Sequence, residues 1–205
     1  MSETSNPNPP FHNKTPHIIN ISTILDSPPS SSSTLINKTH PFDSTRAWQT
    51  FPIGDQTGLT KLGIHLNRIP PNTIGTSLHW HEVSEEWCYI LEAGKGAVLL
   101  VIDEEEEEYD DGVETVIEKK PRVKEIPISK GSFLAFPAGV KRAHGLKSDD
   151  NPIIYLVGGS RVEVDVCHYP ELEKMLVYHS TASQGWLMDD KHVQVRPPKS
   201  SNSSK

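Results

Sequence analysis

The stretch that decides the fold is GTSLHWHEVSEEWCYILEAG, residues 75–94, in which two histidines, a glutamate and an apolar run follow one another. One residue separates His79 from His81, so on a β-strand both imidazoles project from the same face. Glu86 follows five residues later, beyond the turn-like sequence EVSE. A tight connection there would return its carboxylate to the histidine pair, which indicates metal-ligand geometry.

A second stretch, GSFLAFPAGVKRAHGLKS at residues 131–148, supplies a further imidazole from His144 after an apolar strand. We expect Gly131, Pro137 and Gly139 to shape turns at strand ends, because these residue types do so far more often than they do chemistry. Three imidazoles and one carboxylate suit one divalent transition metal ion, Zn, Fe, Mn, Ni or Cu, with coordination positions left for water or substrate.

The two stretches resemble the two motifs of the cupin superfamily, and the resemblance covers about residues 60–170. It implies an all-β fold, the jelly-roll barrel or double-stranded β-helix, and a metal ion bound by four residues: His79, His81, Glu86 and His144. The segment HWH…EWCYIL is similar to the oxalate decarboxylases. The segment PAGVKRAH and the downstream YPELEK resemble a group of single-domain cupins that mostly lacks an assigned reaction.

The sequence departs from the family pattern in its spacing. Gly75 lies closer to the first histidine than the motif has it, Gly94 comes one residue late, and four residues rather than two precede His144 after the PAG turn. Ser148 replaces the usual asparagine. The motif also permits Glu85 as the ligand, but in oxalate decarboxylase-like motifs the ligand directly precedes the aromatic of E-W-x-Y, which favours its neighbour Glu86.

The composition agrees with an all-β domain of residues 46–188. Seventeen prolines and thirteen glycines punctuate short apolar runs, and TKLGIHLNRIPP at residues 60–71 alternates with a period of two. The sequence YPELEKMLVYH, residues 169–179, shows brief helical spacing after Pro170 and predicts one short C-terminal helix.

Three segments lie outside this regular pattern. Of residues 1–45, 27 are Ser, Thr, Asn or Pro, which predicts a flexible low-complexity arm, although residues 17–25 (HIINISTIL) are apolar enough to add a strand. We interpret residues 103–124 as an acidic hairpin insertion, because a calcium loop would need alternating acidic ligands. Residues 189–205 predict a disordered tail.

Charge and cysteine content limit the partners. The formal net charge is -7, and eight of the acidic groups lie in residues 103–111, with no Lys/Arg cluster to bind phosphates, so we expect no nucleic-acid partner. Cys88 and Cys167 are far apart and indicate no disulfide framework, with Cys88 a small buried apolar group. No stretch approaches the ~18 apolar residues of a membrane span. We expect a cytoplasmic homodimer without membrane contact.

These observations favour a metal-dependent enzyme acting on a small polar or carboxylated organic molecule. The reaction could be dioxygenation, decarboxylation, isomerisation or lyase chemistry, and the candidates for a second polar role are Tyr89, His65, Arg68 and Arg161. The alternative is a non-catalytic cupin that binds a small molecule. A further acid or base within reach of a metal-bound molecule would favour catalysis.

Overall fold

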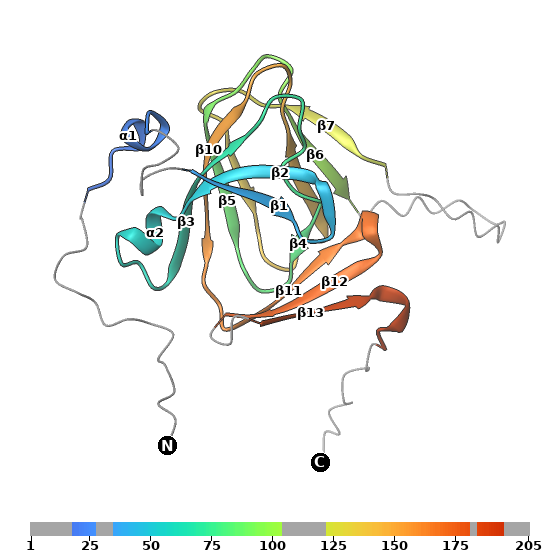
Figure 1. Ribbon diagram of the computed structural model, residues 1–205. Coiled ribbons are helices and arrows are strands. Elements are labelled where there is room, and N and C mark those ends of the chain that lie inside the picture. The colour runs from blue at the N-terminus through green and yellow to red at the C-terminus, as the bar shows by residue number, and fades with distance from the viewer. Residues whose placement is uncertain (1–17, 28–34, 104–121, 181–183, 195–205) are drawn as a thin grey trace, which may run out of the picture.

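The computed structural model describes residues 18–27, 35–103, 122–180 and 184–194, and almost all of them belong to antiparallel strands or their turns (Figure 1). The prediction of an all-β fold is therefore confirmed. The largest sheet has six strands in the order β1 (Ile36–His40), β2 (Asp43–Phe51), β3 (Leu62–Ile69), β10 (Ile153–Ser160), β5 (Glu86–Glu92) and β8 (Phe133–Phe136).

Two smaller sheets complete the barrel. One has the order β13 (Gln184–Asp189), β12 (Lys174–His179), β11 (Val164–Tyr169) and β4 (Trp80–His81), and the other has the order β7 (Lys124–Pro127), β6 (Val98–Asp103) and β9 (Arg142–Lys147). Isolated bridges from Ile74 to Lys147 and from His79 to His144 join the chain before β4 to β9. The two small sheets therefore meet at the predicted ligands.

The period-two alternation of the strands separates an interior face from an exterior one. On β5, Cys88 and Ile90 are buried in the main core with Ile69 and Tyr155, whereas Tyr89 is 40% exposed. Burying these apolar side chains contributes roughly 1.5–3 kcal/mol each. The same alternation turns Glu86, two residues before Cys88, toward the interior.

The segment predicted to add a strand is helical. Residues Ile21–Leu25 form α1, whose first turn is capped because the Asn20 side chain accepts a hydrogen bond from the Ser22 amide at 3.0 Å. Ile24 is buried against Phe51 and Leu66 on the outside of the six-stranded sheet. The prediction of a strand for residues 17–25 was wrong, because a capped apolar turn covers the sheet face here. The second short helix, α2, spans Ile53–Gln56.

The prediction of a short C-terminal helix in residues 169–179 was also wrong. Only one turn of 3-10 helix, η1 (Pro170–Leu172), follows β11, and residues Lys174–His179 form strand β12 between β11 and β13. Glu173 adopts the left-handed backbone (φ 50°), which ends the turn. A second 3-10 turn, η2 (Asp190–His192), follows β13.

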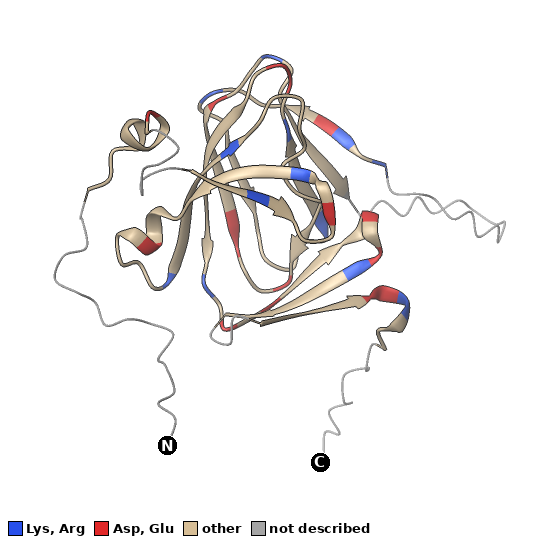
Figure 2. Cartoon of the chain, viewed as in Figure 1, with Lys and Arg blue, Asp and Glu red and all other residues tan. Residues whose placement is uncertain are grey.

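The structure reaches into the predicted arm and tail. Part of the predicted arm, residues 36–45, forms β1 and the start of β2, and an ordered turn occupies residues 190–192. Most of the acidic insertion, residues 104–121, lies outside the described residues. Basic and acidic residues are interspersed over the described elements (Figure 2). Within those residues, no helix has the length and apolar character needed to cross a membrane.

Candidate metal centre

Short backbone contacts bring the two ligand segments together. The His79 amide donates to the His144 carbonyl at 3.2 Å, and the His144 amide donates to the His79 carbonyl at 2.9 Å. The Gly139 amide donates to the carbonyl of His81 at 2.8 Å, and Gly139 has a φ of 75°, which L side chains rarely adopt. The turn glycine of the second stretch thus fixes the first stretch against it.

Four side chains converge at this junction. The Glu86 Oε2 atom lies 3.1 Å from Nε2 of His144, 3.7 Å from Nε2 of His79 and 3.7 Å from Nε2 of His81. Ligands of one ion with bonds near 2.1 Å are separated by about 3.0–3.4 Å. The 3.1 Å distance falls in this range and the two 3.7 Å distances exceed it by a few tenths of an ångström. The donor atoms of His79, Glu86 and His144 all lie within 4.8 Å of one another, and His81 is not part of that group.

The other ring nitrogen of each histidine faces an acceptor. Nδ1 of His79 lies 2.9 Å from the Ser77 carbonyl, Nδ1 of His81 lies 2.8 Å from Asp165 Oδ2, and Nδ1 of His144 lies 3.4 Å from the Arg142 carbonyl. Because carbonyls and ionised carboxylates only accept, each Nδ1 carries the proton. A metal ion bound beside the Glu86 carboxylate would meet the Nε2 lone pairs of the three rings, while each Nδ1 keeps its proton for the outer acceptor.

The electrostatics of the site agree with this donor set. Burial alone would raise the pKa of Glu86, but hydrogen bonds and charge from His144 and His79 hold it well below its ordinary value. Burial lowers the pKa of His144. Burial opposes protonation of His81, yet its hydrogen bond to Asp165 and the charge of Glu86 raise its pKa. The site therefore combines an ionised carboxylate with imidazoles whose orientation is fixed.

The inner face of β11 closes one side of the site. Cys167 lies opposite His81 in the β11–β4 register, and Asp165 and Tyr169, two residues away on either side, share its face. Burial opposes ionisation of Asp165, but hydrogen bonds from His81 and Ser84 lower its pKa to about 2. Sequence reasoning missed this face, although the alternation in VDVCHY is a signal for it.

A cavity of about 590 Å³ opens beside the ligands, within the size range of small-molecule sites. His79, His81 and Glu86 form part of its wall. The remaining lining comes from four further strands, β3, β10, β11 and β12, and their connections. It combines apolar side chains such as Val157, Val162 and Leu176 with the polar residues His65, Ser84, Glu85, Ser160, Arg161, Asp165 and Tyr178. A metal ion on the four ligands would therefore border a space that a small polar molecule can enter.

Comparison with known proteins identifies the fold. A candidate sugar phosphate isomerase from Acidithiobacillus ferrooxidans superposes with a TM-score of 0.69 at 24% identity, over 88% of this chain and 97% of that one. A sugar phosphate isomerase of the cupin superfamily from Silicibacter pomeroyi gives a TM-score of 0.55 at 23% identity, over 73% and 80%. The chain has the cupin fold.

The remaining comparisons give one structural match over a smaller part of the chain and no match by sequence. Oxalate decarboxylase from Bacillus subtilis matches this cupin over 62% of the chain and 27% of its own, at 19% identity and a TM-score of 0.40. No protein-family model matches the sequence, and no curated protein matches it.

Of the four residues suggested as additional polar groups of the active site, two line the cavity and two do not. His65 and Arg161 line the cavity, His65 from β3 and Arg161 just after β10. Arg68 is exposed and Tyr89 is 40% exposed, and neither is among the residues that line the cavity. Both belong to the opposite face of their strands from the one that carries His65 or Glu86.

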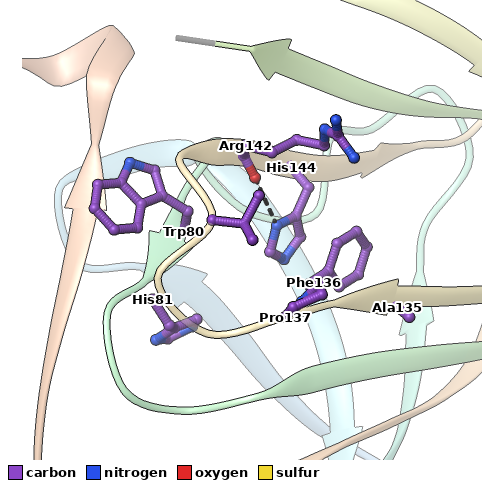
Figure 3. A pocket seen from close by; sticks show the side chains of 8 residues that line it. Trp80, His81, Ala135, Phe136, Pro137, Arg142 and His144 are labelled. Atoms are coloured by element: carbon purple, nitrogen blue, oxygen red, sulfur yellow. Dashed lines mark hydrogen bonds between the residues drawn. The ribbon is translucent and has the colours of Figure 1, made fainter. Parts of the chain in front are cut away.

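Behind the ligands lies a much smaller hollow of about 20 Å³ (Figure 3). The Phe136 ring stacks on His144 with centroids 3.5 Å apart and planes 2° from parallel, while Trp80 stacks on His168 at 4.0 Å. Phe136 thereby limits rotation of the His144 imidazole. The cupin site is thus held by aromatic packing on one side and open to the larger cavity on the other.

Proposed function

We propose that this cupin is a metal-dependent enzyme that acts on a small polar organic molecule bound in the 590 Å³ cavity. The observation that carries the proposal is the convergence of three imidazole Nε2 atoms on the Glu86 carboxylate in the cavity wall. A divalent ion held there would act as a Lewis acid toward a substrate oxygen.

A histidine that is not one of the predicted ligands, His65, also lines the cavity and supports catalysis over binding alone. Nδ1 of His65 lies 3.2 Å from the Thr50 hydroxyl, and burial lowers the His65 pKa, which favours the neutral ring near neutral pH. A neutral imidazole can accept or pass on a proton. A cavity walled only by the ligands and apolar side chains would have favoured the non-catalytic alternative.

Arg161 gives the cavity a cationic group. Its guanidinium pairs with Asp55, which holds the side chain against the cavity wall while leaving other donor positions of the guanidinium for a ligand. We infer that Arg161 orients an oxygen-rich or anionic part of the substrate. Among the four predicted reaction classes we place isomerisation of phosphorylated sugars first, since two solved structures that match 88% and 73% of this chain carry that description.

The experiment uses the full chain purified without chelators or affinity metals. Elemental analysis identifies the bound ion, and the protein is then loaded with Mn, Fe, Ni, Zn or Cu and incubated with sugar phosphates and hydroxy acids, with turnover followed by NMR. We expect one ion per chain and conversion that His65→Gln reduces at least tenfold without loss of metal, while Tyr89→Phe changes neither.

The alternative function has a distinct outcome. Saturable binding of one of these compounds without turnover by any metal form would contradict the enzymatic proposal and favour the binding module. Homodimerisation and a cytoplasmic location stay predictions from the sequence.

A further inference from the structure

A second group of metal donors overlaps the first. The ligand atoms of His79, His81 and Cys167 all lie within 4.8 Å of one another, as do those of His79, Glu86 and His144. The two groups share His79. Neither of the two cupin-like stretches, residues 75–94 and 131–148, contains Cys167.

Strand register explains why the thiol lies there. Cys167 and His81 are directly opposite in the antiparallel β11–β4 pair, so their Cβ atoms are about 4.5–5.5 Å apart and their side chains share a face. The residues on the other face, His168 and Trp80, stack on each other instead. Cys167 is 5% exposed and forms part of the cavity wall beside the ligands.

We propose that Cys167 is a further ligand of the metal ion, binding it as a thiolate together with His79 and His81. The proposal rests on the metal site of the proposed function and adds a sulfur donor to it. Sulfur and nitrogen ligands of one zinc ion are about 3.3–3.6 Å apart, so a group whose atoms lie within 4.8 Å of one another would contract by up to about 1.5 Å.

The surroundings of the thiol suit this role. Without a metal ion, burial and the charges of Glu86 and Asp165 raise the pKa of the Cys167 thiol to about 12, against a side-chain hydrogen bond from Tyr169 that lowers it. A bound cation would displace the thiol proton, and the Tyr169 hydroxyl would then donate a charge-assisted hydrogen bond to the thiolate. On the same strand, the Asp165 carboxylate accepts from His81 and from the amides of Val83 and Val166. Of the inward-facing side chains of β11, Cys167 is the one whose donor atom groups with those of His79 and His81.

The other cysteine provides a matched control. Cys88 is equally buried, and it lies two residues after Glu86 on β5, but among the described residues it belongs to neither donor group. The sequence contains two cysteines, so Cys88→Ser leaves Cys167 as the one thiol in the chain.

A sulfur donor also changes the preferred ion. Thiolates favour zinc, iron, cobalt and copper over manganese and magnesium, which prefer oxygen. We expect Cys167→Ser to reduce zinc affinity at least tenfold while manganese affinity changes less than threefold, so that the preference for zinc over manganese falls.

The decisive experiment loads the full chain with cobalt(II) and records its absorption spectrum. We expect one cobalt ion per chain and a thiolate-to-cobalt charge-transfer band in the near ultraviolet, which Cys88→Ser retains and Cys167→Ser loses. Stoichiometric cobalt without the band would overturn the thiolate ligand and leave the four-residue site standing. A chain that binds no cobalt would overturn both.

X-ray absorption keeps the test independent of how Cys167→Ser folds. Zinc-loaded Cys88→Ser should show a metal–sulfur distance of about 2.3 Å. A first shell that contains only nitrogen and oxygen in that variant contradicts the assignment.

Discussion

Replacing Asp165 by asparagine should weaken metal binding although Asp165 is not itself a ligand. Its Oδ2 accepts from Nδ1 of His81 at 2.8 Å, while its Oδ1 accepts from the amides of Val83 at 3.1 Å and Val166 at 2.9 Å. The carboxylate therefore accepts on both oxygens. An asparagine of the same shape can accept on one side only.

The two orientations of the amide lead to two different losses. If Nδ2 faces His81, two donors meet, and the ring adopts the tautomer that carries its proton on Nε2, which removes the lone pair that faces Glu86. If Nδ2 faces the loop, it opposes the amides of Val83 and Val166, and the turn after β4 loses its anchor. Removing such an outer carboxylate costs 10–100-fold in metal affinity, or about 1.4–2.7 kcal/mol.

The assay is competition with a chromogenic chelator, followed for zinc and for manganese at pH 7.5. Asp149→Asn is the matched control, because Asp149 also accepts from backbone amides, those of Gly96 at 2.7 Å and Asn151 at 2.9 Å, at a turn outside the site. We expect the Asp165 variant to lose at least tenfold and the Asp149 variant less than twofold. Equal affinities in wild type and Asp165→Asn would refute the reasoning that this carboxylate orients His81.

Three further outcomes follow from other parts of the barrel. Burial lowers the pKa of His40 to about 4, so between pH 4 and pH 6.5 the folded chain binds fewer protons at this residue than the unfolded chain, and the free energy of unfolding should fall as the pH is lowered through this range. Urea titrations in the presence of chelator should show a smaller fall for His40→Gln than for wild type. The same pH dependence in both would contradict this prediction. A Cβ on Gly159 would lie 2.7 Å from the Glu85 carbonyl oxygen, whereas one on its cross-strand partner Gly63 meets only ordinary contacts. Gly159→Ala should therefore cost about 1–3 kcal/mol in urea unfolding and Gly63→Ala less than about 0.5 kcal/mol, and equal costs would argue against this close approach. Replacing residues 104–121 with a short Gly-containing turn should leave metal content unchanged, since the paired strands Val98–Val101 and Lys124–Pro127 are retained, and elemental analysis showing loss of metal would mean that the insertion reaches the site.

Local sequence patterns were sufficient where the alternation of one strand decides the outcome. The period of two in β5 predicts which of its residues face the interior, and it correctly turned Cys88 inward. In β3 the apolar Leu66 instead packs on the outer face of the sheet, and His65 faces the cavity. The resemblance to oxalate decarboxylase-like motifs favoured Glu86 over Glu85. The structure brings the Glu86 carboxylate to the three imidazoles, whereas Glu85 is exposed.

Local sequence patterns could not predict which distant segments pair as strands. Residues Lys174–His179 resemble a helical turn locally, but they form a strand because β11 and β13 on either side supply hydrogen-bonding partners. The polar residues of β1 form an edge strand for the same reason, through pairing with β2. Secondary structure here depends on tertiary partners more than on local preference.

The roles of Asp165 and Cys167 were missed for a related reason. Their contacts with His81 span more than 80 residues and depend on the β11–β4 register, which no spacing within either segment reveals. His40, within the predicted flexible arm, is likewise only 6% exposed and packs against Phe42 and Tyr169. Its burial also depends on the strand pairing of a segment that composition alone marked as flexible.

The central claim is that one metal ion binds directly to the three imidazoles and to the Glu86 carboxylate that lies between them. Metal titration of variants at Glu86 and its neighbour Glu85 tests this claim most directly. Glu86→Gln keeps the size of the side chain but removes the charge that lies 3.1–3.7 Å from all three Nε2 atoms, whereas Glu85→Gln makes the same change on the exposed neighbour. We predict that wild type and Glu85→Gln bind one equivalent with matching affinity and that Glu86→Gln binds at least tenfold more weakly. Unchanged binding by Glu86→Gln, or a loss confined to Glu85→Gln, would contradict the account.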